Sequence, residues 1–169
     1  MRIIFVDGYN VINSWPNLKK MKDYSFEGAR QSLIDSLVNY GSYMDCKIIV
    51  VFDAHMVSGA LENKERIGNV LIVFTKDGET ADSYIEKNVN NIGRKTEVFV
   101  VTSDSLEQQT VFQRGAVRMS SLEFYYEVLK TEKIITNKAD KLKLIKRHKL
   151  EDSLKDEIKE KLEKIRRNQ

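Results

Sequence analysis

Residues 3–10, IIFVDGYN, contain the pattern that decides the fold. Four consecutive apolar side chains are followed by Asp7 and Gly8, with Asn10 close behind. A short apolar run that stops at a glycine is typical of a core strand in a parallel sheet. The carboxyl ends of such strands form the ligand crevice of open α/β sheets. We therefore expect the Asp7 carboxylate to face whatever the protein binds.

The same pattern returns further along the chain. The other strand-like apolar runs span residues 48–52, 70–74 and 97–101. Asp53 directly follows the first of these runs, and Asp104 follows the last after two hydroxyl residues. The middle run leads through a turn at 76–78 into a predicted helix, with Asp82 in its first turn. Acidic residues thus recur where strands are expected to end.

Helical periodicity separates these runs. Apolar residues recur at three- and four-residue spacing in segments that predict helices. These segments span residues 26–44, 79–92, 105–113 and 120–129. Ser120 and Glu123 have capping-box spacing, a brief strand is expected at 117–119, and residues 11–24 are interpreted as a long loop. Alternating strands and helices predict an α/β fold with a mostly parallel sheet covered on both faces.

In such a sheet, Asp7, Asp53, Asp82 and Asp104 converge on one edge. Clustered carboxylates raise one another's pKa unless a cation neutralises them. Mg²⁺ and Mn²⁺ prefer oxygen ligands, and two such ions about 4 Å apart support phosphodiester hydrolysis. Each aspartate taken alone also fits a turn or a helix cap. The combination predicts metal-dependent phosphoryl transfer to water.

Several other chemistries lack their required residues. The sequence contains neither a G-x-x-x-x-G-K-[ST] nor a G-x-G-x-x-G motif, so a glycine-rich phosphate loop is unsupported. A haloacid-dehalogenase-like phosphatase would need an aspartate where Tyr9 stands. His55 and His148 are too few for a histidine-rich zinc site. Cys46, the single cysteine, is expected to be a buried structural thiol.

The chain is long enough for one domain and an appendage, which we place at residues 1–129 and 130–169. Residues 1–129 carry 14 Lys and Arg against 17 Asp and Glu, a net charge of −3; residues 130–169 carry 14 against 8, a net charge of +6. The predicted amphipathic tail helix places apolar side chains on one face. They are Leu150, Leu154, Ile158, Leu162 and Ile165. The basic tail suggests contact with a polyanion, and a solvated helix face is the alternative.

No stretch has the pattern of a signal peptide or the apolar length of a membrane span. We therefore expect a cytoplasmic protein without membrane contact.

Four segments resemble the motifs of NYN domains, a branch of the PIN-like ribonucleases. They are DGYNVI at residues 7–12, VFDAHMV at 51–57, ETADSYIE at 79–86 and VTSD at 101–104. The extended form of the second motif, in which Asp-Ala-His follows the second expected strand, resembles the bacterial YacP family within that branch. The resemblance runs in order through about residues 1–129, which form most of the chain.

The resemblance implies a three-layer α/β/α PIN-like domain whose acidic edge binds Mg²⁺ or Mn²⁺ and cuts RNA internally. Asp7, Asp53, Asp82 and Asp104 match the acidic cluster of the family, and Asn10 matches the amide that orders it. The hydroxyl positions before the last aspartate correspond to Thr102 and Ser103. The family is also associated with cleavage of messenger RNA on the ribosome, which implies both as partners.

The leading hypothesis is a metal-dependent endoribonuclease that leaves 5′-phosphate and 3′-hydroxyl ends. Backbone phosphates are neutralised by basic side chains, and the candidates here are Lys19, Lys20, Lys22, Arg94 and Lys95. Tyr9 and Trp15 are candidates for stacking on unpaired bases, with packing as the alternative. Two other functions fit less well. One is an RNA- or ribosome-binding adaptor with little catalysis, and the other is a small-molecule phosphohydrolase.

Overall fold

The central element of the fold is a six-stranded sheet with the strand order β3-β4-β2-β1-β5-β6. A computed structural model describes residues 2–53, 61–92, 96–103 and 116–167. The strands are β1 (Arg2–Asp7), β2 (Lys47–Phe52), β3 (Asn63–Ile67), β4 (Val70–Phe74), β5 (Glu97–Val101) and β6 (Val117–Met119). Only β3 runs antiparallel to its neighbour, so the predicted mostly parallel sheet is confirmed.

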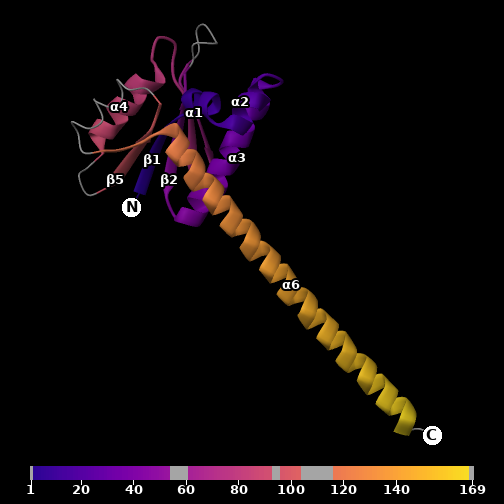
Figure 1. The fold of residues 1–169 in the computed structure, drawn as a ribbon. Coiled ribbons are helices and arrows are strands. Elements are labelled where there is room, and N and C mark those ends of the chain that lie inside the picture. Colours follow the sequence, from indigo (N-terminus) through magenta and orange to yellow (C-terminus); the bar gives the residue numbers. More distant parts are fainter. Residues whose placement is uncertain (1, 54–60, 93–95, 104–115, 168–169) are drawn as a thin grey trace. The chain divides into compact units, whose positions relative to one another are not determined.

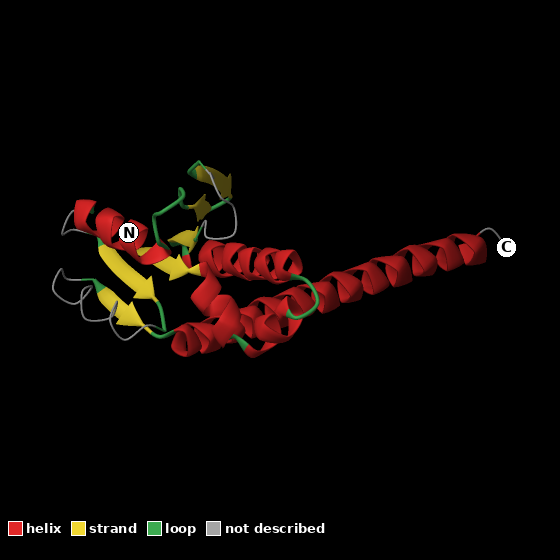
Figure 2. Cartoon of the chain, turned by 90° about the horizontal axis from the view of Figure 1, so that it is seen from above, coloured by secondary structure: helices red, strands yellow, loops and turns green. Residues whose placement is uncertain are grey.

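Helices cover both faces of the sheet, which makes three layers (Figure 1, Figure 2). The described helices are α1 (Gly8–Ser14), α2 (Pro16–Lys22), α3 (Phe26–Met44), α4 (Ala81–Asn91) and α6 (Ser121–Arg167). In β1, Ile4 and Val6 point into the core formed with α1, α2 and α3, whereas Phe5 points into the core formed with α4. This alternation explains why the strand is apolar throughout. The predicted helix at 105–113 lies outside the described residues.

The segment 11–24 is not the long loop that we predicted. It contains α1 and α2, which meet at Trp15. Asp7 caps the first helix by accepting a hydrogen bond from the Asn10 backbone N–H, and Pro16 opens the second at the position where proline is tolerated. Val11, Trp15 and Leu18 are buried at helical spacing. The proline therefore starts a helix here and does not mark a loop.

Strand β3 was also absent from the sequence prediction. It joins β4 through a two-residue turn in which Gly68 has a φ of +58°, a conformation that glycine adopts at low cost. Its residues are exposed except for the half-buried Ile67. Because side chains on both faces of this edge strand are exposed, it carries no apolar pattern that hydrophobic periodicity could reveal.

The two longer helices of the body agree with their sequence signals. Helix α3 spans the predicted residues, with Ser25 capping it by accepting a hydrogen bond from the Gly28 backbone N–H at 3.0 Å. Helix α4 is shorter than predicted at each end and is capped by Thr80. Cys46 follows α3 and is buried, and burial raises the pKa of its thiol. A buried neutral thiol fits the structural role that we expected.

Helix α6 is continuous from Ser121 to Arg167, where we had expected a separate helix at 120–129 followed by a tail helix. The predicted capping box at its start is confirmed. Glu123 accepts a hydrogen bond from the Ser120 backbone N–H at 2.7 Å, and the Glu123 backbone N–H donates to the Ser120 hydroxyl at 3.2 Å. The chain forms two compact units, Met1–Glu132 and Lys133–Gln169, and α6 passes through both.

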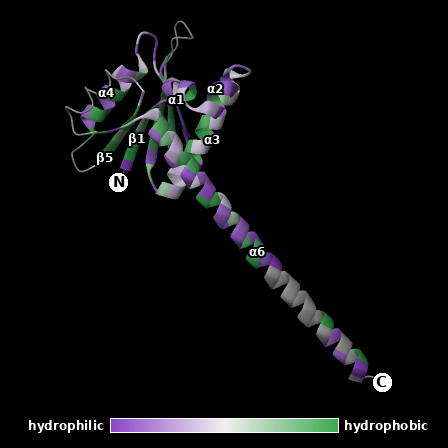
Figure 3. Ribbon diagram, in the orientation of Figure 1, coloured by the Kyte–Doolittle hydropathy of each residue, from purple (hydrophilic) through white to green (hydrophobic). Residues whose placement is uncertain are grey.

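Hydrophobic colour is concentrated on the strands of the sheet, whereas polar and apolar residues alternate along the described part of α6 (Figure 3). Ile158 and Ile165 of the predicted apolar stripe are 55% and 64% exposed. The side chains of Leu150, Leu154 and Leu162 lie outside the described part. None of the helices in the described ranges combines the length and apolar character that a bilayer span requires.

Trp15 is a core residue, so the structure excludes the base-stacking role considered for it. Its side chain is 2% exposed and lies within 6.0 Å of Phe124 and 5.2 Å of Tyr125, measured between ring centroids. Its indole N–H donates a hydrogen bond to the Ser121 carbonyl at 2.9 Å. Trp15 therefore attaches the α1–α2 junction to the first turn of α6.

We expect Trp15→Phe to lower the free energy of unfolding by about 1–3 kcal/mol, because it removes the buried indole hydrogen bond to Ser121 and leaves a space where the larger ring packs. Urea unfolding followed by far-ultraviolet circular dichroism measures the change. Tyr24→Phe is the matched control, since the Tyr24 side chain is 93% exposed. Equal stability of the two variants would contradict the proposed anchoring role.

Candidate acidic site

Asp7 is the last residue of β1 and the N-cap of α1, so the strand end and the helix start share one carboxylate. Its Oδ1 accepts a hydrogen bond from the Asn10 backbone N–H at 2.9 Å. The side chain is only 7% exposed. Burial raises the pKa of Asp7, hydrogen bonds from Asn10 and Tyr9 oppose that shift, and the charge of Asp53 adds to it. Asp7 is therefore a buried carboxylate that would gain from a nearby positive charge.

Asn10 connects the ends of two strands. Its Nδ2 lies 3.4 Å from Asp7 Oδ2 and 3.4 Å from the hydroxyl of Thr102, which follows β5. Thr102 is 1% exposed, and its backbone N–H donates to the Met119 carbonyl of β6. These contacts hold the Asn10 side chain against the Asp7 carboxylate. The ordering role that the resemblance implies for Asn10 stays a prediction. Buried Thr102 contacts Asn10, and its predicted contact with substrate stays a prediction.

Three of the predicted carboxylates line one cavity of about 330 Å³. Asp7 comes from the end of β1, Asp53 directly follows β2, and Asp82 lies in the first turn of α4. The predicted convergence at the carboxyl edge of the sheet thus holds for these residues. Asp104, the fourth predicted member, lies outside the described residues.

The donor chemistry of this cavity suits a hard divalent cation. Its wall offers carboxylate oxygens and the side-chain amide of Asn10, which are ligand types that Mg²⁺ and Mn²⁺ accept. Within the ranges that the structure describes, however, no three acidic, histidine or cysteine side chains are grouped closely enough to hold a metal by themselves. Mg²⁺ commonly keeps several waters and uses one or two carboxylates, so the described residues fit such a hydrated ion.

Gly8 is required by close packing between the start of α1 and the end of β2. A Cβ atom at this position would lie 2.3 Å from Cε1 of Phe52, the residue that precedes Asp53. The Tyr9 ring packs against Phe26 and Phe52, with centroid distances of 5.3 Å to each, and Tyr9 also lines the cavity. Tyr9 therefore has the packing role that was one of its two predicted alternatives, and it also lines the cavity. The other alternative, stacking on an RNA base, stays a prediction.

Ser103 is engaged in hydrogen bonds within the protein, although we had predicted it to bind substrate. Its hydroxyl lies 3.1 Å from the Ser14 hydroxyl and donates to the Ser121 hydroxyl at 2.8 Å. Ser14 in turn donates to the Asn10 carbonyl at 2.7 Å. These hydroxyls connect the start of α6 to the helix that carries Asn10.

The predicted phosphate-binding lysines differ in their position. Lys22 donates a hydrogen bond to Asn13 Oδ1 at 2.7 Å, and Asn13 lines the acidic cavity. Lys19 and Lys20 are exposed on α2 and are not among the residues that line the cavity. Arg94 and Lys95 lie outside the described residues. Lys22 is thus the predicted cation that the structure links to the site.

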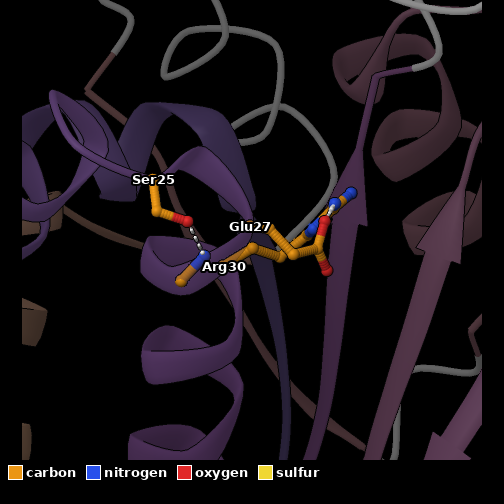
Figure 4. A network of polar contacts seen from close by, with 4 residues as sticks. Ser25, Glu27 and Arg30 are labelled. Carbon is orange, nitrogen blue, oxygen red and sulfur yellow. Dashed lines mark hydrogen bonds and ion pairs between the residues drawn. The ribbon is translucent and has the colours of Figure 1, made fainter.

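Asn13, Thr80 and Arg30 are neighbours of the site that sequence reasoning missed. Asn13 and Thr80 line the cavity, one three residues after Asn10 on α1 and the other as the N-cap of α4. Recognition of α1 as a helix would have placed Asn13 on the same side as Asn10. Arg30 forms an ion pair with Glu27 near the Ser25 cap of α3 (Figure 4). Its guanidinium lies over the rings of Phe52 and Phe74, which are distant in sequence, so no local pattern signals it.

We expect Gly8→Ala to destabilise the protein by about 1–3 kcal/mol, because the added methyl group has no space beside Phe52. Chemical denaturation measures this loss, and Asn17→Ala on the exposed side of α2 provides the control. An alanine variant as stable as the parent would show that the Phe52 ring does not constrain this position.

Comparison with known proteins agrees with this architecture. The family model of the YacP-like NYN domain matches residues 4–167, which includes most of the tail. YacP of Bacillus subtilis (strain 168) is 46% identical over 145 residues, covering 84% of each chain. The crystal structure of Rae1 (YacP) from Bacillus subtilis matches with a TM-score of 0.76 at 42% identity, over 99% of this chain and 95% of that one.

A crystal structure of a point mutant of Rae1 (YacP) from the same organism matches with a TM-score of 0.72 at 41% identity, over 84% of each chain. The family match covers nearly the whole sequence. Sequence identities of 42% and 46% are high enough to indicate common family membership as well as a common fold. The chain belongs to the YacP-like NYN domain family, which has a PIN-like nuclease fold.

Proposed function

We propose that the protein is a divalent-metal-dependent endoribonuclease. The observation that carries this proposal is the cavity that Asp7, Asp53 and Asp82 line together at the carboxyl edge of the sheet. Carboxylates brought together from separate elements repel one another unless a cation lies between them. Family membership supports a nuclease over a small-molecule phosphohydrolase.

In this proposal Asp7, Asp53 and Asp82, together with Asp104, hold Mg²⁺ or Mn²⁺. When bound, the metal supplies an activated water and neutralises charge that develops on the phosphoryl group. Asn10 fixes the Asp7 carboxylate through its backbone and side-chain N–H groups. Lys22, which Asn13 holds at the cavity wall, contributes positive charge for the RNA backbone. We expect products with 5′-phosphate and 3′-hydroxyl ends.

We further propose messenger RNA on the ribosome as the substrate. The support is the basic tail, with a net charge of +6 over residues 130–169. Within α6, exposed basic side chains are dense between residues 138 and 147; they are Lys138, Lys141, Lys143, Lys146 and Arg147. Such a concentration of positive charge favours contact with RNA phosphates. The match of the family model as far as residue 167 includes this tail within the family pattern.

We expect Asp7→Asn and Asp82→Asn each to lower the rate of RNA cleavage in Mg²⁺ by more than about a hundredfold, the upper range for residues that only support a metal ligand. Single-turnover cleavage of an end-labelled RNA gives the rate. Asp77→Asn, in the exposed turn after β4, is the matched control. If the Asp7 variant cuts as fast as the parent, the catalytic assignment is wrong and a binding adaptor becomes the better interpretation.

We expect replacement of Lys141, Lys143, Lys146 and Arg147 by Gln to reduce cleavage of ribosome-bound messenger RNA more than cleavage of the same RNA free in solution. The tail would supply contact with the ribosome, whereas the acidic cavity would perform the reaction on either substrate. Cleavage assays on translating ribosomes and on naked transcript measure both. An equal loss, or no loss, on the two substrates would contradict a ribosome-directed tail.

A further inference from the structure

Arg30 lies at the same edge of the sheet as the acidic cavity. Its guanidinium carbon is 5.8 Å from the ring centroid of Phe52 and 5.2 Å from that of Phe74. These two rings are the last residues of β2 and β4, and they stack with a centroid distance of 5.5 Å. The Arg30 guanidinium therefore lies beside the carboxyl ends of β2 and β4. Aromatic faces also hold a guanidinium without using its N–H donors.

The Phe52 ring connects Arg30 to the site. The Phe52 ring also contacts the ring of Tyr9, which lines the cavity. The residue that follows Phe52 in the sequence is Asp53, another cavity residue. The positive charge of Arg30 is close enough to oppose the burial-induced rise in the pKa of Tyr9. Arg30 thus lies over the rings of Phe52 and Phe74, and Phe52 in turn contacts the cavity residue Tyr9.

The guanidinium has a weakly held partner. Glu27, one turn earlier on α3, forms an ion pair with it, and Figure 4 shows the two side chains meeting. The Glu27 side chain is 76% exposed, whereas that of Arg30 is 21% exposed. Exposed ion pairs of this kind contribute little stability. A guanidinium carries five N–H donors, and among the described residues Glu27 is its one hydrogen-bond acceptor.

We propose that Arg30 binds a backbone phosphate of the RNA next to the scissile one, and that Glu27 occupies Arg30 until that phosphate displaces it. This inference rests on the proposed endoribonuclease function. A cavity lined by carboxylates repels the phosphates that flank the reacting one, so a fixed cation beside it is needed to hold the strand. The planar guanidinium group can donate two parallel hydrogen bonds to one phosphate. The exposed ion pair with Glu27 is weak enough for a phosphate to replace it.

A purely structural role makes a different prediction from this exchange. If the ion pair only stabilised α3, loss of either partner would act in the same direction. If Glu27 competes with phosphate, loss of Arg30 weakens RNA binding while loss of the Glu27 charge strengthens it. The two single variants therefore separate the two roles.

The test uses the full chain and a fluorescein-labelled single-stranded RNA dodecamer. Single-turnover cleavage in Mg²⁺ across a series of protein concentrations gives the half-saturating concentration and the maximal rate. Anisotropy in Ca²⁺ measures binding in parallel. Arg66→Ala is the matched control, because Arg66 pairs with Leu71 near the opposite end of β4. Thermal unfolding establishes that each variant is folded.

We expect Arg30→Ala to raise the half-saturating concentration by roughly tenfold with little change in maximal rate, as for loss of a hydrogen bond to a charged group. The slope of log affinity against log salt should fall by about 0.7. Arg30→Lys should be intermediate, because it keeps the charge and loses the fork. Glu27→Gln should lower the half-saturating concentration, and Arg66→Ala should leave it unchanged.

Two results would overturn the inference. One is an Arg30→Ala variant that binds and cuts like the parent, and the other is a Glu27→Gln variant that loses affinity as Arg30→Ala does. Both leave the proposed function intact as long as the parent cuts the RNA. A parent that binds the dodecamer through Arg30 in the anisotropy assay and never cuts it would instead contradict the nuclease function.

Discussion

The structure depends most on how the Asp7 carboxylate is held. A carboxylate that is 7% exposed loses hydration that only hydrogen bonds or a cation can replace. Asn10 provides the hydrogen bonds because α1 begins at once after β1, and this immediate start places the Asn10 backbone and side-chain N–H groups on Asp7. The direct connection from β1 to α1 therefore positions the hydrogen-bond donors of the Asp7 carboxylate.

This junction also determines how closely the neighbouring strand can approach. Gly8 has no side chain, so the Phe52 ring lies against the start of α1 and Asp53 follows it at the cavity wall. On the other side, Asn10 reaches Thr102 after β5, and the hydroxyls of Ser14 and Ser103 extend the contacts to α6. Three parallel strands thus bring polar groups to one region, and hydrogen bonds between residues distant in sequence connect two of their ends.

The sequence predicted those features that depend on local pattern. Apolar runs ending in aspartate indicated the central strands and the convergence of Asp7, Asp53 and Asp82, because burial on both faces leaves an unbroken apolar run. Strand β3 escaped detection since an exposed edge strand has no such run. The prediction for the α1–α2 segment was wrong because Pro16 suggested a loop. The positions of Trp15 and Arg30 depend on residues distant in sequence, which periodicity cannot show.

Calorimetric titration with Mn²⁺ measures whether carboxylates from separate elements form one cation site. We expect the parent to bind Mn²⁺, and we expect Asp53→Asn and Asp82→Asn, changed one at a time, each to weaken binding by at least about tenfold, as when a metal site loses a supporting group. Asp77→Asn should bind like the parent. Unchanged Mn²⁺ affinity in both cavity variants would show that these carboxylates do not form a shared cation site.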